Sequence, residues 1–135
     1  MVVQAHQQLT HEWWQRALPK FDLFISAPVI DEISRGDATM AEERLKVVQS
    51  IPILSGSQDI EILADAYHAA LQLPERSRLD ALHLAYASWH GIDYLLTWNC
   101  AHLASARVRR MLGDWNSANG IWTPVICTPE ELLED

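Results

Sequence analysis

The sequence has few of the features that mark secreted or membrane-spanning proteins. It contains only two cysteines, Cys100 and Cys127, among 135 residues. That is too few for a disulfide framework and is typical of a reducing compartment. No apolar run approaches the roughly 20 residues of a membrane-spanning helix. The N-terminus lacks the basic start and apolar core of a signal peptide. We therefore expect a cytoplasmic protein with no membrane contact.

Basic residues are also scarce. The chain has 10 Lys and Arg against 18 Asp and Glu, a formal net charge of −8. Affinity for phosphate comes mainly from Lys and Arg, so this balance argues against a general nucleic-acid coat. It does not exclude a nuclease whose acids are neutralised by bound metal. The most basic stretch, Arg107, Arg109 and Arg110, fits either a contact with nucleic acid or a solvated helix face.

Zinc-ligand spacing, internal repeats, low-complexity segments and linkers are all missing. Among six histidines and two cysteines, Cys100 and His102 lie close together, but no second pair follows them. A chain of this length can bury about two-thirds of its unfolded surface in one core. We therefore expect residues 1–135 to form a single domain.

The stretch 78–102 is the most informative part of the sequence. It predicts a helix with one apolar face at steps of three and four, made of Leu79, Leu82, Tyr86 and Trp89. Small residues beside that face allow another element to pack closely: Ala81, Ala85 and Ser88. Gly91 stands where a left-handed helix cap would fall.

A short strand, residues 94–97, follows the helix and reads as buried on both faces because it is apolar throughout. Around this stretch the pattern alternates strands with helices. Strands are expected at 21–26, 52–54 and 125–127, and helices at 4–18, 28–35, 38–49, 58–73 and 101–112. Residues 113–120 read as a polar loop, and Thr128 with Glu131 as a capping box. The expected fold is α/β, with helices around a mostly parallel sheet.

Three polar residues occupy positions where open α/β sheets bind ligands. Glu32 lies in a helix directly after a strand, Asp80 lies near the start of the central helix, and Asn99 follows a strand. We expect them to converge on one crevice. Each also has a plainer interpretation: Asp80 as part of a Ser77-to-Asp80 capping box, Glu32 as a solvated acid and Asn99 as a turn residue.

Together with residues 28–33, 80–85 and 96–99, these positions resemble the PIN domain family, which includes the VapC-type toxin ribonucleases of toxin–antitoxin pairs. The resemblance covers residues 21–132. It implies a three-layer sandwich and a cluster of acids that binds Mg²⁺ or Mn²⁺ to cleave RNA. Glu32, Asp80 and Asn99 then become the catalytic and metal-binding residues.

Two departures from the family pattern bear on activity. The family begins with a central strand that carries an acid, and no stretch before His6 can supply both. Asn99 stands where the family usually has another Asp, and its amide oxygen brings no charge. The expectation is a PIN-like sandwich with its first strand missing, weak metal binding, and RNA cleavage that is slow or absent.

Other contacts follow from the same reading. Trp98 can stack on a base, and Thr97, His83 and Arg107 are further candidate substrate contacts, although a hydrogen-bonded interior histidine is the plainer interpretation of His83. The expected partners are RNA and a small antitoxin protein. Strands 21–26 and 94–97 would face the gap left by the first strand, which favours a homodimer or larger assembly. The alternative function is an inactive PIN-like module that binds protein or RNA.

Overall fold

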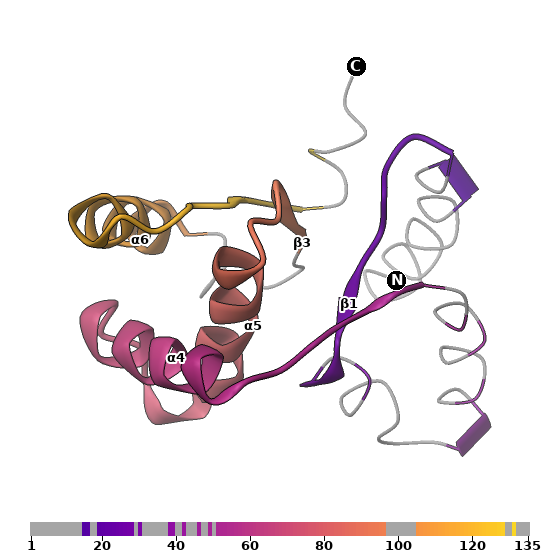
Figure 1. Cartoon of the computed structure of the whole chain (residues 1–135), viewed down its shortest axis with the longest axis horizontal. Helices are drawn as coiled ribbons and strands as arrows, with labels where there is room; N and C mark the ends of the chain where they lie inside the picture. The colour runs from indigo at the N-terminus through magenta and orange to yellow at the C-terminus, as the bar shows by residue number, and fades with distance from the viewer. Residues whose placement is uncertain are drawn as a thin grey trace, which may run out of the picture.

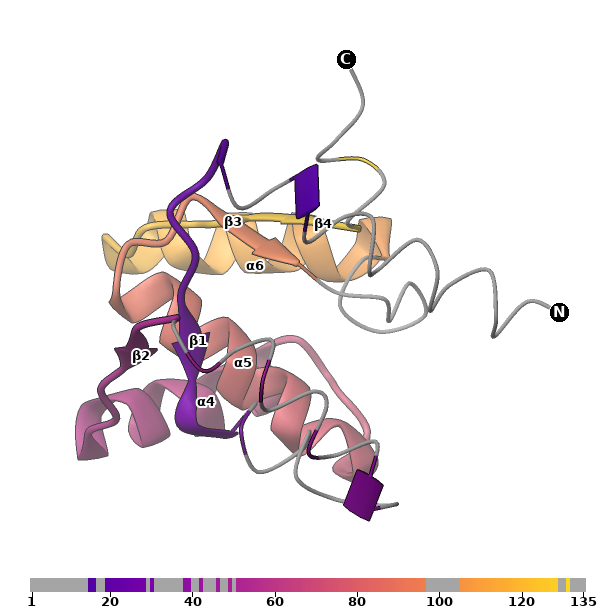
Figure 2. The same ribbon diagram turned by 90° about the vertical axis from the view of Figure 1, so that its right-hand side faces the viewer.

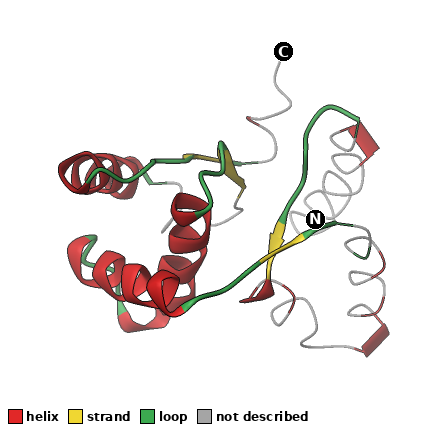
Figure 3. Cartoon of the chain, in the orientation of Figure 1, coloured by secondary structure: helices red, strands yellow, loops and turns green. Residues whose placement is uncertain are grey.

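The computed structural model describes residues 15–16, 19–28, 30, 38–39, 42, 46, 49, 51–96, 105–128 and 131. Within them the chain is of mixed α/β type, with helices and short parallel strands (Figures 1 and 3). The elements in chain order are β1 (Ile25–Ser26), β2 (Ile53–Leu54), α4 (Gln58–Ala70), η1 (Glu75–Ser77), α5 (Arg78–Trp89), β3 (Tyr94–Leu96), α6 (Ala106–Asn119) and β4 (Val125–Cys127). The helices expected at 4–18, 28–35 and 38–49 lie largely outside the described residues.

The strands form two separate parallel pairs. β1 pairs with β2, with Ile25 opposite Ile53, and β3 pairs with β4, with Tyr94 opposite Val125. In Figure 2, β4 runs across the view while β1 runs nearly along the vertical, so the two pairs do not continue one another. The parallel pairing is confirmed, but a single sheet is not formed among the residues that the structure describes.

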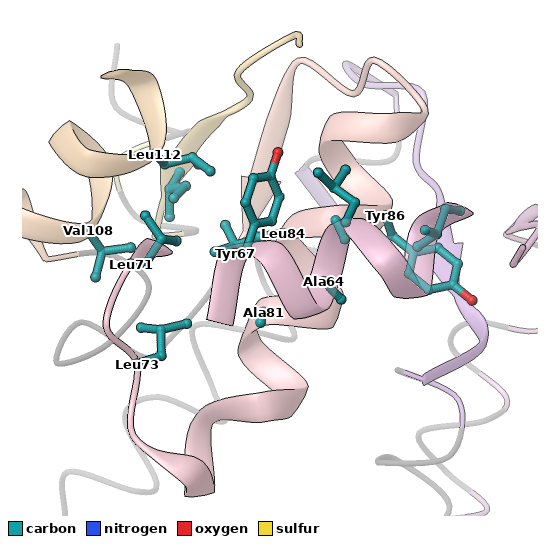
Figure 4. Packing of buried hydrophobic residues seen from close by; sticks show 13 residues of the cluster. Ala64, Tyr67, Leu71, Leu73, Ala81, Leu84, Tyr86, Val108 and Leu112 are labelled. Atoms are coloured by element: carbon teal, nitrogen blue, oxygen red, sulfur yellow. The ribbon is translucent and has the colours of Figure 1, made fainter. Parts of the chain in front are cut away.

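The core lies where α4 packs along α5, with α6 and β4 against them (Figure 4). Five apolar residues of α4 and its C-cap, at helical spacing, are all buried: Ile60, Leu63, Ala64, Tyr67 and Leu71. On α5 the buried residues include the small side chains Ala81, Ala85 and Ser88, which let the two helices approach closely.

The predicted apolar face of α5 is only partly correct. Tyr86 is buried, whereas Leu79 and Leu82 are half-buried and Trp89 is largely exposed. The buried stripe instead runs through Ala81, Leu84, Ala85 and Ser88, because α4 packs on the small residues. The spacing of large side chains alone indicated the wrong centre for the buried face.

Several boundaries also differ from the sequence-based expectation. The strand expected at 21–26 is paired only at Ile25–Ser26. The helix expected at 58–73 ends at Ala70. Gln72, two residues before Pro74, takes a left-handed conformation (φ 52°). β3 is not buried on both faces, since Tyr94 is 46% exposed. These differences fall at element ends, where local signals are weakest.

The helix ends agree with the local sequence more closely. Ser57 caps α4 by accepting a hydrogen bond from the Ile60 amide at 3.3 Å. Gly91 is left-handed (φ 64°), as expected after α5. The capping box also forms: the Thr128 amide donates to Glu131 Oε1 at 3.0 Å, and the Glu131 amide donates to Thr128 Oγ1 at 3.3 Å.

Candidate functional site

The start of α5 positions Asp80. Pro74 is extended (ψ 159°), and the Ser77 amide donates to the Pro74 carbonyl oxygen at 2.8 Å, closing the turn of η1. η1 then runs directly into α5, so that Asp80 falls in the first turn of the helix and is half-buried. Amide groups at a helix N-terminus favour a negative charge there, which suits a carboxylate at this position.

Ser77 is not an open N-cap for α5. Its side chain makes no hydrogen bond to the first turn of the helix. Its amide donates to the Pro74 carbonyl oxygen, because Ser77 belongs to η1, which runs directly into α5. The Ser77 side chain therefore does not cap α5 as the sequence pattern indicated.

Arg78, the first residue of α5, forms ion pairs with two acids. Arg78 Nε donates to Glu75 Oε1 at 2.7 Å, and Arg78 Nη1 lies 3.6 Å from Asp65 Oδ1 on α4. Hydrogen bonding to Arg78, together with the charge of Arg78, lowers the pKa of Glu75. Hydrogen bonding to Glu75, together with the charge of Glu75, raises the pKa of the Arg78 guanidinium. All three groups are exposed, so the pair helps to orient η1 and contributes little to stability.

The turn at Gly91 sends β3 back along α5. The Ile92 amide donates to Ala87 O at 2.9 Å. After this turn β3 runs back in the direction from which α5 came (Figures 1 and 2). α5 is about 18 Å long at 1.5 Å per residue, and β3 covers about 10 Å of the return. The carboxyl end of β3 consequently points toward the end of α5 that carries Asp80. Parallel strands bind ligands beyond such carboxyl ends.

Four of the predicted site residues lie outside the described residues: Glu32, Thr97, Trp98 and Asn99. Their convergence with Asp80 stays a prediction. In the described part of the chain, no group of three or more His, Cys, Asp or Glu side chains is placed to hold a metal ion. Asp80 is the described member of the proposed oxygen-donor set, which is of the type that Mg²⁺ prefers.

His83 and Arg107 are both described, and they differ in exposure. His83 lies one turn after Asp80 and is half-buried. Arg107 is exposed on α6, and its Nη1 donates to the Leu71 carbonyl oxygen at 3.0 Å, at the end of α4. The same nitrogen lies 3.3 Å from Met111 Sδ. One face of the Arg107 guanidinium therefore serves to join α6 to α4.

A buried polar network was missed by the sequence reasoning. The Tyr67 hydroxyl donates to Asn116 Oδ1 at 2.7 Å, and Asn116 Nδ2 donates to Trp122 O at 3.2 Å and to Thr123 Oγ1 at 3.1 Å. Burial raises the pKa of the Tyr67 phenol. Residues 113–120 were expected to form a loop, so nothing in the sequence signalled that Asn116 would be buried.

Cys127 is the described cysteine, and it is buried in β4. Burial, with a smaller contribution from the Glu131 charge, raises the pKa of its thiol to about 11. A thiol with this pKa is almost entirely protonated at neutral pH, and the thiolate is the nucleophilic form. Cys127 is consequently a packing residue and not a nucleophile.

No described helix combines the length and the apolar character needed to cross a membrane. No family model, curated protein or solved structure matches the chain.

Proposed function

We propose that this chain is a PIN-like, metal-dependent endoribonuclease whose activity is weakened, with the three-layer sandwich of that family as its fold. The observation that supports this most is the hairpin of α5 and β3, which directs the carboxyl end of a parallel strand toward Asp80. Among the residues that the structure describes, the strands pair in parallel, as the resemblance implies. Both features agree with the resemblance seen in the sequence.

Glu32 and Asp80 are the proposed carboxylate ligands of Mg²⁺ or Mn²⁺, and Asn99 supplies a neutral oxygen. A bound ion of this kind polarises the scissile phosphate and lowers the pKa of a water molecule. Asp80 would hold its carboxylate at the N-terminus of α5, where the helix dipole favours the charged form. Two carboxylates and one amide make a less negative site than four acids, so we expect loose metal binding and slow cleavage.

The substrate contacts would come from the same end of α5. Trp98 offers a ring on which a base can stack. His83 follows Asp80 by three residues, and Thr97 precedes Asn99 by two. Arg107 keeps part of its guanidinium exposed beyond its bond to Leu71, and could contact phosphate there. In a toxin–antitoxin pair, a small antitoxin protein would hold such a nuclease inactive.

The second candidate function is an inactive PIN-like module that binds protein or RNA. Asn99 in place of an acid favours it. It predicts that RNA binds without being cleaved and that Mn²⁺ has no effect on the bound RNA.

RNA turnover in Mn²⁺ or Mg²⁺ separates the two functions. We expect slow cleavage that EDTA stops and that Asp80→Asn abolishes. The cleavage rate of Asp59→Asn should stay within about twofold of the rate of the parent protein. Asp59 is the matched control because it is also an acid in the first turn of a helix, α4, but is exposed. Asp80→Asn should also weaken Mn²⁺ binding, measured by calorimetry, by roughly tenfold or more.

Cleavage that Asp80→Asn does not change would contradict the proposed site. Brisk metal-dependent cleavage abolished by Asp80→Asn would retain the site and show that Asn99 is an adequate ligand. RNA binding with no turnover in either metal would support the inactive module instead.

A further inference from the structure

A group of exposed apolar side chains lies at the amino ends of β3 and β4. Tyr94 and Val125 are paired in register and are 46% and 56% exposed. Trp122 is 54% exposed, and its Nε1 donates to Ile92 O at 2.9 Å, two residues before Tyr94. The Phe21 ring meets the Tyr94 ring edge-on, with centroids 6.4 Å apart. We call Phe21, Tyr94, Trp122 and Val125 the amino-end patch.

The patch is held in a fixed geometry by backbone contacts. The Val125 amide donates to Asp93 O at 2.8 Å, which joins the two strand starts. The Trp122 indole is oriented by its bond to Ile92, so its ring is not free to fold onto the core. These rings lie at the end of the β3–β4 pair opposite to the carboxyl end proposed for metal and RNA. The amino-end patch is therefore a separate surface.

The size of the patch favours a short segment over a whole protein face. Three side chains about half exposed amount to roughly 300 Å² of surface, since large aromatic side chains bury about 150–250 Å² each. A stable protein–protein interface needs about 800 Å² per partner. Rigid Trp and Tyr side chains are nevertheless the residues that most often supply binding energy in small interfaces.

The charges near the patch favour a positively charged partner. Exposed Asp22 and Asp93 adjoin Phe21 and Tyr94, and Lys20 is the one Lys or Arg within residues 19–24, 90–94 and 119–126. The whole chain carries −8. A second copy would bring like charges to this surface, which disfavours it as the occupant. We propose that the amino-end patch docks a short basic polypeptide segment with apolar anchors.

Binding of two synthetic peptides to the full chain tests this proposal. One peptide carries two Leu among four Lys in a Gly/Ser background, and the other has Glu in place of each Lys. Fluorescence anisotropy of the labelled peptides should give tighter binding of the Lys peptide by at least tenfold. Val125→Lys should weaken that binding at least tenfold, and Asp93→Asn several-fold, with the latter loss vanishing at high salt.

Ile62→Lys is the matched control, because Ile62 is 59% exposed on α4, outside the patch. It should change affinity no more than twofold. Trp122→Phe, which removes the indole bond but keeps an aromatic ring, serves as a milder second variant, and circular dichroism checks that each variant is folded. No binding of the Lys peptide, equal binding of the Glu peptide, equal loss in Ile62→Lys, or a dimer that Val125→Lys dissociates would each overturn the proposal.

Discussion

Asn116 is the residue at which local sequence and tertiary structure disagree most. It is fully buried in the last turns of α6. A buried amide is tolerated only when its donors and acceptor are satisfied. Asn116 meets that condition by accepting from Tyr67 on α4 and donating to the segment that leads to β4. The Asn116 side chain thereby links α6 to α4 and to the segment that precedes β4.

Asn116→Ala should destabilise the protein by about 1–3 kcal/mol, because it leaves the Tyr67 hydroxyl and the Trp122 carbonyl without their partner. Urea denaturation measures this loss. Asn119→Ala is the control: Asn119 is exposed on the same helix, and its Nδ2 donates to Trp115 O. It should cost no more than about 0.5 kcal/mol. Equal losses in the two variants would contradict the assigned network.

Cys127 should be unreactive in the native protein. With a pKa of about 11, only about one thiol in a thousand is ionised at pH 8. The raised pKa stabilises the fold while the thiol is protonated, and this contribution is lost as the pH rises from the ordinary thiol range toward 11. In a Cys100→Ser background, modification by a thiol reagent at pH 8 should be at least ~100-fold slower than in urea. Similar rates in both conditions would show that the thiol is accessible.

At the scale of the elements, α6 shows how packing overrides local signals. Gly113 suggested a helix end, since glycine costs about 1 kcal/mol relative to alanine inside a helix. The helix nevertheless continues to Asn119 because Leu112 and Asn116 bury their side chains on either side of that glycine. Gly120 is the residue that ends it, in the left-handed conformation (φ 67°).

The two glycines should respond in opposite directions to the same substitution. A Cβ at either position would meet no atom within 4 Å, so only backbone conformation differs. Gly113→Ala should stabilise the protein by about 0.5–1 kcal/mol, and Gly120→Ala should destabilise it by about 1–2 kcal/mol. Thermal or urea unfolding compares the pair directly. Changes of the same sign would mean that α6 ends elsewhere.

At the scale of the whole molecule, the two strand pairs seen in the described part of the chain have a consequence for assembly. Isolated two-stranded sheets are marginal in water, and each unsatisfied buried backbone group costs about 1–3 kcal/mol. We propose that strand edges are satisfied by a second copy, giving a homodimer or larger assembly. Such pairing uses backbone donors and acceptors, whereas the amino-end patch uses side chains.

Sedimentation over a range of concentrations should detect that assembly, with the mass falling toward the monomer on dilution. Val125→Lys, which changes an exposed side chain and no backbone donor, should leave the mass unchanged. A monomer at every concentration would mean that the strand edges are satisfied within one chain.

The sequence by itself determined the parts of this protein that depend on neighbours along the chain. The cap at Ser57, the left-handed Gly91 and the Thr128–Glu131 capping box each require only residues a few positions apart. The mixture of helices and strands, and the inward face of α4, follow from hydrophobic periodicity in the same way. Asp80 was placed correctly in the first turn of α5, because Pro74 and the apolar spacing fix that helix start.

Only the tertiary structure decided features that depend on distant contacts. The buried face of α5 is set by the close approach of α4 to its small residues. The length of α6 is set by the burial of Asn116, whose partner Tyr67 lies 49 residues away. The separation of the strands into two pairs, and the exposure of Tyr94, depend on which strand edges meet in space. Local sequence carries no information on such contacts, because each is chosen by competition among elements far apart in the chain.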